Sequence, residues 1–119
     1  MLRGIRGAIT AEKNGKIEIL GATQELLKKM LDENQIKTEN IASIIFSMTP
    51  DLNAEFPAAA ARQMGLNLVP LFCVSEIAKP GALQKCIRVL IHVNTEKDIS
   101  TIKHVYLKGA QVLREEYKA

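Results

Sequence analysis

The sequence predicts a single domain of the α/β or α+β class, and two observations support this prediction. Its 119 residues are the length of one domain, and 47% of them are hydrophobic, which is enough apolar surface for a core. Apolar segments with the spacing of strands and of helices follow one another, without a repeat, low-complexity tract or linker between them. We therefore expect residues 1–119 to form one unit of interleaved strands and helices.

The first expected strand spans residues 2–9 and carries Arg6 on a face of small residues. Because side chains alternate between the two faces of a strand, Arg6 shares its face with Gly4 and Ala8, opposite the two isoleucines of the segment. Arg6 is therefore the unusual residue of this face.

A long helix is expected over residues 16–33. Its apolar positions recur at helical spacing: Ile17, Leu20, Leu27, Met30 and Leu31. Asn34 is suited to end this helix. A second strand follows over residues 41–48, and the turn sequence Thr49-Pro50-Asp51 closes it.

A short helix and two further strands follow. Pro57 suits the first turn of the short helix and Gly65 suits its end. The next two strands, over residues 69–75 and 86–93, are separated by the turn sequence Lys79-Pro80-Gly81.

The strand over residues 86–93 presents one face that is entirely apolar and one that carries Arg88. The apolar face consists of Ile87, Val89, Ile91 and Val93. The other face consists of Cys86, Arg88, Leu90 and His92. A guanidinium in a mostly buried strand needs an anionic partner, because an unpaired buried charge is very costly. Either a carboxylate of the fold or a bound anionic ligand must therefore face Arg88.

The C-terminal segment, residues 102–113, has two interpretations. Its apolar residues would line one face of a helix, and the triplet Val105-Tyr106-Leu107 is also suited to a short strand. Both interpretations stay open at this point.

Composition excludes several classes of function. No stretch of about 20 apolar residues could span a membrane. The net charge is +3, but the lysines are scattered and often lie beside carboxylates, so we expect no nucleic-acid partner. No signal peptide is evident and only two cysteines occur, which favours a cytoplasmic protein with reduced thiols. The small size makes an oligomer a reasonable expectation.

Arginine is used sparingly in this chain. Only five of the 16 basic residues are arginine: Arg3, Arg6, Arg62, Arg88 and Arg114. The arginine fork binds carboxylates through two parallel hydrogen bonds, so arginines beside apolar or small residues indicate a site for a carboxylate-bearing ligand. A structural ion pair with Asp or Glu stays open as the alternative for each of them.

Other chemical signals are weaker. His92 and His104 have no second ligand at metal-binding spacing, so we expect no metal site. Cys73 ends an apolar strand and is more typical of a small buried residue than of a nucleophile. Glu76 follows that strand, where polar residues often line ligand sites, although a surface carboxylate is as good an interpretation. The residues alone thus predict an arginine-lined pocket for an anionic small molecule, without metal or cofactor.

Five motifs occur in order between residues 2 and 114. They are Arg3-Gly4-Ile5-Arg6-Gly7-Ala8, Thr49-Pro50-Asp51-Leu52-Asn53-Ala54 through Phe56-Pro57-Ala58, Cys73-Val74-Ser75-Glu76, Cys86-Ile87-Arg88-Val89-Leu90 and His104-Val105-Tyr106-Leu107. Together they closely resemble the monofunctional α/β class of chorismate mutases. The resemblance implies one mixed β-sheet packed against one long and one short helix, in a homotrimeric pseudo-barrel with active sites at the subunit clefts.

The resemblance also implies a reaction and its residues. The expected reaction is the rearrangement of chorismate to prephenate, on the route to phenylalanine and tyrosine, with no metal, cofactor or covalent intermediate. Arg88 would stabilise the negative charge that grows on the ether oxygen. Arg6 would clamp a carboxylate, Tyr106 would offer a hydroxyl, and Glu76 and Cys73 would lie near the ring end.

A wall of the pocket is expected from the adjacent subunit. By resemblance this wall contains Phe56, Ala58 and Arg62, and a C-terminal flap contains Leu113 and Arg114. The resemblance also favours an extended chain at Val105-Tyr106-Leu107.

Two positions depart from the pattern of the class. Ala59 replaces a lysine found in relatives, and Phe72 replaces a smaller polar residue. Phe72, Val74 and Ser75 would therefore contribute to substrate binding only through backbone and shape.

Two other functions would use the same arginines. One is a small trimeric imine or enamine hydrolase of similar architecture, which has no evident need for Cys73 and Glu76. The other is a trimer that binds an anionic metabolite without turning it over.

Overall fold

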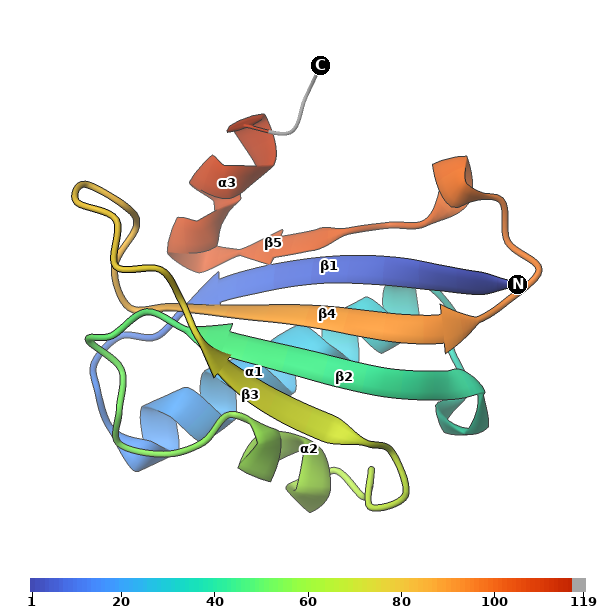
Figure 1. The fold of residues 1–119 in the computed structure, drawn as a ribbon, viewed down its shortest axis with the longest axis horizontal. Helices are drawn as coiled ribbons and strands as arrows, with labels where there is room; N and C mark the ends of the chain where they lie inside the picture. Colours follow the sequence, from blue (N-terminus) through green and yellow to red (C-terminus); the bar gives the residue numbers. More distant parts are fainter. Residues whose placement is uncertain (117–119) are drawn as a thin grey trace.

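In the computed structural model, which describes residues 1–116, five strands form one mixed sheet in the order β3-β2-β4-β1-β5 (Figure 1). The strands are β1 (Leu2–Thr10), β2 (Ile41–Met48), β3 (Leu71–Ser75), β4 (Cys86–Asn94) and β5 (Val105–Leu107). The central strands β1, β4 and β2 are antiparallel, whereas the edge strands β5 and β3 run parallel to β1 and β2. The mixed sheet that the resemblance implied is confirmed, and residues 117–119 of the expected domain lie outside the described residues.

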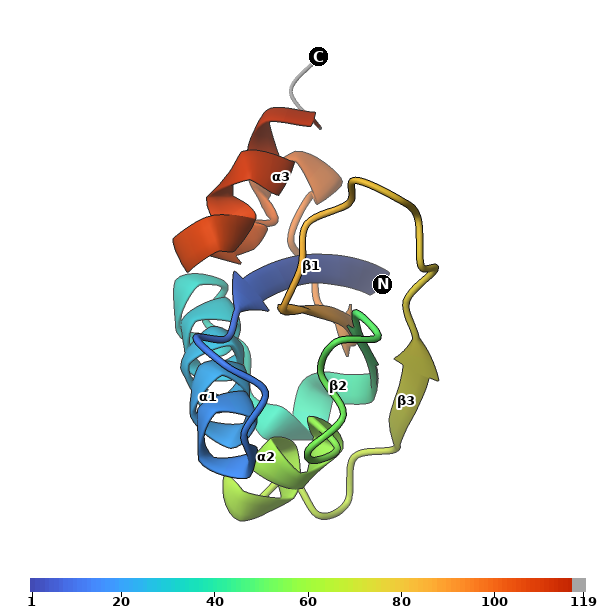
Figure 2. The same cartoon turned by 90° about the vertical axis from the view of Figure 1, so that its left-hand side faces the viewer.

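The helices α1 (Lys16–Glu33) and α2 (Ala58–Gln63) pack on the same side of this sheet (Figure 2). Their buried side chains join the isoleucines of β1 and the odd-numbered residues of β4 in the main core, as the alternation predicted. Gly7 faces α1, and a Cβ at this position would overlap the side chain of Met30. The close approach of α1 to β1 therefore depends on a glycine at position 7.

Both helices end near the predicted residues. Asn34 follows the last residue of α1, and Gln35 has a left-handed φ of 53°, so the predicted stop is confirmed. Pro57 precedes α2 with a helical φ of −64°. The helix ends at Gln63, just before Gly65, whose φ of +88° takes the chain out of helical geometry.

The C-terminal segment contains a strand and a helix in succession. Val105–Leu107 pairs with β1, so the extended conformation favoured by the resemblance is confirmed and a continuous helix from residue 102 is wrong. Lys108 has a left-handed φ of 53°, and after a short 3-10 turn the helix α3 (Gln111–Glu116) begins. Some of the apolar residues that recur at helical spacing in residues 102–113 therefore lie in the strand β5 and not in a helix.

The third strand begins at Leu71 rather than at residue 69 as predicted. Pro70 lies between the two positions and has no backbone N–H to contribute to the ladder. Its carbonyl still accepts a hydrogen bond from the N–H of Ile44.

Within residues 1–116 the fold contains no helix that is long and apolar enough to cross a membrane.

Candidate active site

Each strand contributes one side chain to a row across the face of the sheet that α1 and α2 leave uncovered. Arg88 on β4 pairs with Ser47 on β2 and with Ala8 on β1. Ser47 in turn pairs with Val74 on β3, and Ala8 pairs with Tyr106 on β5. Residues directly opposite one another in neighbouring strands present their side chains on the same face. The sheet therefore places Arg88 at the centre of this row, with Tyr106 at one end.

Arg6 lies in the neighbouring row, where it pairs with Leu90 of β4. The two rows enclose a cavity of about 240 Å³. It is lined by Arg6, Gly7, Ala8, Ile45, Ser47, Val74, Arg88, Val89, Leu90 and Tyr106. The structure thus brings four of the predicted site residues to one cavity: Arg6, Val74, Arg88 and Tyr106.

Glu76 connects Arg88 to Ser47. Its Oε1 lies 3.6 Å from Nε of Arg88, and its Oε2 accepts a hydrogen bond of 2.5 Å from Oγ of Ser47. The side chain of Arg88 is 36% exposed and that of Glu76 is 25% exposed. A carboxylate of the fold therefore faces Arg88, and the guanidinium is half-buried rather than fully buried.

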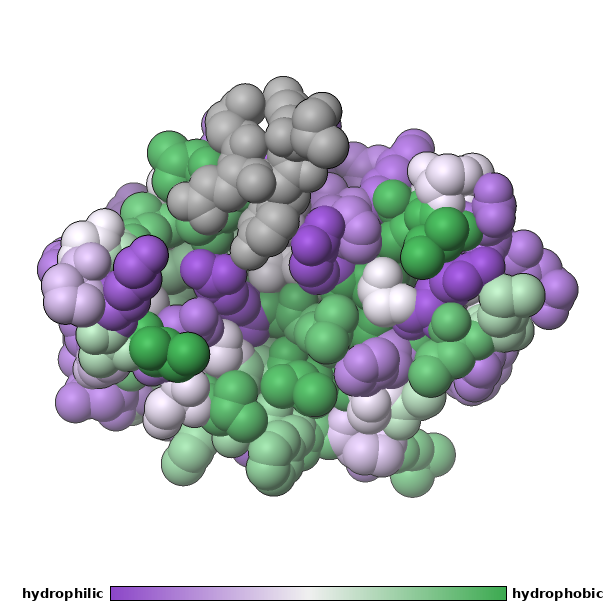
Figure 3. Space-filling model, turned by 45° about the horizontal axis from the view of Figure 1, so that its top comes forward, coloured by the Kyte–Doolittle hydropathy of each residue, from purple (hydrophilic) through white to green (hydrophobic). Residues whose placement is uncertain are grey.

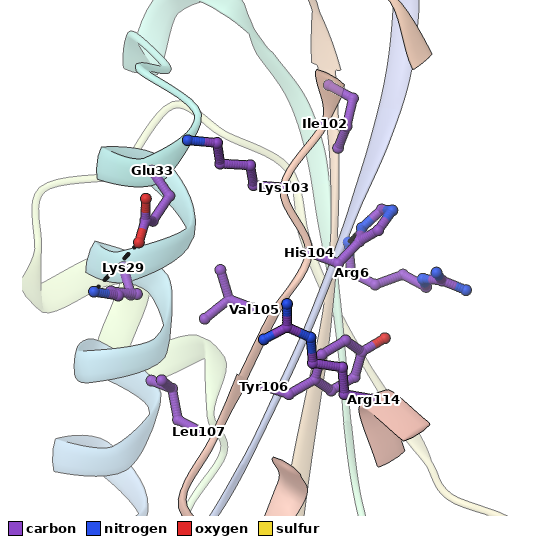
Figure 4. Close-up of a pocket in the computed structure, with 10 residues that line it drawn as sticks. All are labelled: Arg6, Lys29, Glu33, Ile102, Lys103, His104, Val105, Tyr106, Leu107 and Arg114. Atoms are coloured by element: carbon purple, nitrogen blue, oxygen red, sulfur yellow. Dashed lines mark hydrogen bonds and ion pairs between the residues drawn. The ribbon is translucent and has the colours of Figure 1, made fainter. Parts of the chain in front are cut away.

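A larger cavity lies beside β5, between α1 and α3, and also contains Arg6 and Tyr106 (Figure 4). Its volume is about 590 Å³, and Arg114 of α3 lines it. In Figure 4 the Arg6 side chain and the Tyr106 hydroxyl extend to the same side of the sheet. Leu113 is buried beside Ala8, so the base of α3 is fixed to the face that carries Arg88.

Cys73 lies on the other face of β3. It pairs with the buried Phe46, and its half-buried side chain packs against the main core. Together with Phe56, Val74 and Ser75 it lines a separate cavity of about 570 Å³ under the loop that follows β2. Of the residues that line this 570 Å³ cavity, only Val74 also lines the Arg88 cavity.

The three residues expected from an adjacent subunit stand apart from Arg88 within one chain. Phe56 is 67% exposed, Ala58 is buried in the main core, and Arg62 is exposed on α2. Because α2 packs on the opposite side of the sheet from Arg88, one chain does not bring these residues to the Arg88 cavity.

Two ionisable side chains near the site have shifted pKa values. Burial raises the pKa of the Cys86 thiol, and the nearby Arg88 only partly opposes this effect. Burial, reinforced by the charge of Arg6, lowers the pKa of His104. The Cys86 thiol is therefore held protonated, and the His104 imidazole is held neutral down to a lower pH than usual.

Three residues near the site were not predicted from the sequence. Ser47 shares one face of β2 with Ser43 and Ile45, opposite the buried Ile44 and Phe46, so a serine on the open face was a usable signal. His104 was considered as a metal ligand and as the first residue of a motif, and Asn34 only as a helix stop. Their contacts with Arg6 and Lys103 join segments far apart in the chain, which no local pattern reveals.

Among the side chains of residues 1–116 that are described, no group of three or more His, Cys, Asp or Glu is placed to hold a metal ion. Cys73 and Cys86 are free thiols. The Arg88 cavity is lined by the charged side chains of Arg6 and Arg88, and Glu76 is paired with Arg88. Such a set can bind an anion and stabilise developing charge without a metal.

The chain is similar over almost its full length to known chorismate mutases. A family model described as chorismate mutase type I matches residues 2–117. Chorismate mutase AroH of Bacillus subtilis (strain 168) is 46% identical over 115 residues, which cover 96% of this chain and 91% of that protein. Chorismate mutase AroH of Thermus thermophilus is 49% identical over 115 residues, or 96% of this chain and 94% of that protein.

The fold is also similar to that of a solved structure over most of the chain. Chorismate mutase from Clostridium thermocellum (Cth-682) matches with a TM-score of 0.91 and 54% sequence identity, over 92% of this chain and 98% of that chain. The sequence motifs, the mixed sheet and these matches agree. The chain described here therefore belongs to the chorismate mutase type I family.

Proposed function

We propose that this chain converts chorismate to prephenate by electrostatic stabilisation of the pericyclic transition state, at a site centred on Arg88. As a member of the chorismate mutase type I family, the chain is an isomerase of aromatic amino acid biosynthesis. The observation that supports the site is the cross-strand row that places Arg88 and Tyr106 around the same cavity as Arg6. We treat residues 1–119 as a single catalytic domain.

Arg88 is the proposed donor to the ether oxygen of the substrate. As the carbon–oxygen bond stretches, negative charge grows on that oxygen, and a fixed guanidinium binds it better in the transition state than in the ground state. The ion pair with Glu76 and the strand pairing on both sides hold Arg88 in place before substrate arrives. Little reorganisation is then needed during the reaction.

Arg6 and Tyr106 bind the other end of the substrate in this proposal. Chorismate carries two carboxylates, and Arg6 clamps one of them, which favours the folded conformer that reacts. Tyr106 donates its hydroxyl in the same region of the cavity. Leu113 and Arg114 form a flap over it, and Arg114 already lines the cavity that contains Arg6 and Tyr106.

Glu76 and Cys73 serve the ring end of the substrate. Glu76 accepts a hydrogen bond from the ring hydroxyl and supports the positive charge that develops on the ring. Before substrate binds, the two oxygens of Glu76 contact Ser47 and Arg88, so the carboxylate is already positioned at the site. Cys73, whose side chain lies on the core side of β3, contributes through its backbone and the shape of this strand, without attacking the substrate.

The complete site requires a homotrimer in this proposal. The exposed Phe56 and Arg62 of an adjacent subunit, together with the backbone at the buried Ala58, close the pocket that one chain leaves open. The uncovered face of the sheet supports an assembly of this kind, since Phe72 is 65% exposed and Val74 is 43% exposed. Hydrophobic residues also run through the middle of this side of the molecule (Figure 3). Phe72, Val74 and Ser75 then line the substrate through backbone and shape, and the trimer works in the cytoplasm.

The proposed reaction can be tested directly with purified protein. Loss of chorismate absorbance is followed in buffer that contains a chelator, and the product is identified by mass spectrometry. Prephenate formed at a rate proportional to protein concentration supports the proposal. Unchanged chorismate with a folded, oligomeric protein would contradict it and favour a trimer that only binds an anionic metabolite.

A further inference from the structure

We propose that His104 is a positioning residue for Arg6: its neutral imidazole accepts a hydrogen bond from the backbone of Arg6 and so extends the ladder between β1 and β5 by one residue. Protonation of the ring at acidic pH releases this contact. The structural contact is independent of substrate. Its effect on turnover rests on the proposed function, in which Arg6 clamps a substrate carboxylate.

The imidazole takes the place of a backbone acceptor. The regular pairing of β1 with β5 begins at Gly7 and Val105 and includes Ala8 and Tyr106. One residue earlier, the backbone N–H of Arg6 donates instead to Nδ1 of His104, at 3.0 Å. Nδ1 can accept only if it carries no proton, so the neutral ring must hold its proton on Nε2.

The backbone that carries His104 is itself fixed. Nδ2 of Asn34 donates to the carbonyl of Lys103 at 2.8 Å, and Oδ1 of Asn34 accepts from the N–H of Lys103 at 2.8 Å. Asn34 is fully buried at the end of α1, where it also donates to the carbonyl of Met30. The chain at residue 103 is therefore attached to α1, while the imidazole of the next residue bonds to β1 beside Arg6 (Figure 4).

The charges around His104 favour the neutral ring. The ionisable residues that line its cavity come from β1, α1, its own segment and α3: Arg6, Lys29, Glu33, Lys103, Tyr106 and Arg114. The carboxylate among them, Glu33, is paired with Lys29 at 3.3 Å. Burial and the charge of Arg6 lower the pKa of His104 from its ordinary value, which agrees with an accepting Nδ1 at neutral pH.

Acidification then acts on Arg6 through this contact. A proton on Nδ1 turns the acceptor into a donor that faces another donor, the N–H of Arg6, and it adds a positive charge beside the guanidinium. Both effects displace β1 at Arg6. The rearrangement itself exchanges no proton with the enzyme, and the carboxylates of chorismate remain ionised well below the pKa of histidine. A histidine-like acid limb in kcat/KM is therefore not expected from the chemistry alone.

Two variants separate the hydrogen bond from the titration. The chain has two histidines, so His92→Asn leaves His104 as the remaining imidazole and serves as the matched control. His104→Asn keeps an acceptor near the position of Nδ1 but cannot titrate in this range. We expect kcat/KM of the parent and of His92→Asn to fall at acidic pH, below the usual titration range of histidine, and that of His104→Asn to stay flat.

A third variant, His104→Leu, removes the acceptor at every pH. We expect its KM for chorismate to rise about tenfold at neutral pH, the scale of one lost hydrogen bond, with a smaller change in kcat and no acid limb. A protein whose folded fraction merely falls would instead show a lower apparent kcat with an unchanged KM. An acid limb that persists in His104→Asn would overturn the proposal.

The hydrogen bond is also measured without substrate, by NMR of the ¹⁵N-labelled protein. A scalar coupling across the N–H···N bond, between Arg6 N and His104 Nδ1, is expected at neutral pH and should vanish at acidic pH. No coupling at neutral pH, with the ring proton on Nδ1, would overturn the proposal. If the coupling is present but Arg6→Ala keeps normal kinetics, the role of Arg6 in the proposed function fails instead.

Discussion

Replacing Asn34 should destabilise the protein far more than a typical change at a helix end. The Asn34 side chain has 0% exposure and makes hydrogen bonds to the carbonyl of Met30 at 2.9 Å and to the carbonyl and N–H of Lys103, both at 2.8 Å. In Asn34→Ala the two partly buried backbone groups of Lys103 lose this partner. Each such group costs about 1 to 3 kcal/mol, so we expect a loss of about 3 kcal/mol in the free energy of unfolding.

Asn34→Asp provides a sharper comparison at the same site. The carboxylate can still accept from the N–H of Lys103, but its second oxygen faces the carbonyls of Met30 and Lys103, where the amide donated. A negative charge at the end of α1 is also unfavourable to the helix dipole. We therefore expect Asn34→Asp to be at least as destabilising as Asn34→Ala.

Urea denaturation at one fixed protein concentration measures both variants, because assembly can make apparent stability depend on concentration. Asn40→Ala is the matched control, since Asn40 is exposed and a change there should stay within about 0.5 kcal/mol. If Asn34→Ala lost less than about 1 kcal/mol, the hydrogen bonds of Asn34 would not stabilise the attachment of β5 as argued here.

Further predictions concern the two thiols and two of the glycines. Cys73→Ser should lower kcat only mildly, because no thiolate attack is proposed, and a variant as inactive as Arg88→Ala with an intact fold would reopen covalent catalysis. In the native parent, a thiol reagent at about pH 8 should modify the half-buried Cys73 and leave Cys86 unreacted, since burial raises the pKa of the Cys86 thiol; rapid labelling of both would refute this. Gly21→Ala should stabilise the protein by about 0.5 to 1 kcal/mol, because a Cβ there contacts nothing within 4 Å in an exposed turn of α1. Gly7→Ala should destabilise it by about 1 to 3 kcal/mol, because its Cβ overlaps a buried side chain of α1, and thermal or urea unfolding that gives the opposite order of these two variants would contradict the packing described.

Residue alternation predicted the face of the sheet that carries Arg88 well. Along β4, the four odd-numbered residues from 87 to 93 are buried, and Arg88 lies on the opposite face. Each of these positions has a strand on both sides, so the period of two is enforced by burial over the whole strand. The face of Arg6 on β1 followed from the same rule.

The C-terminal segment was ambiguous because its strand is short. β5 has three ladder pairs with β1, and its neighbours return to helical geometry within a few residues. Three residues with high strand propensity do not outweigh helical spacing on local grounds. Tertiary contacts favour the strand over the helix in this segment: His104 accepts a hydrogen bond from Arg6, and Asn34 accepts one from Lys103.

The remaining site could not be assembled from one sequence by physical rules alone. Alternation places Val74 on the Arg88 face, but it also sends Cys73 to the core side of β3. Phe56 and Arg62 lie outside the Arg88 cavity of one chain, so only the family resemblance suggested a role for Phe56 and assigned Arg62 to a wall from an adjacent subunit. Contacts between segments nearly 100 residues apart, such as that of Arg6 with His104, leave no periodic signal in the chain.

The role of Arg88 is tested most directly by the turnover of chorismate in Arg88→Ala and Arg88→Lys, measured beside the parent protein at saturating substrate. Circular dichroism and sedimentation first establish that each variant has the fold and assembly of the parent. We predict that Arg88→Ala lowers kcat at least about 100-fold, the scale of losing one preorganised donor to a developing oxyanion, and that lysine restores only part of it. Near-normal turnover by a folded Arg88→Ala protein would contradict the proposed mechanism.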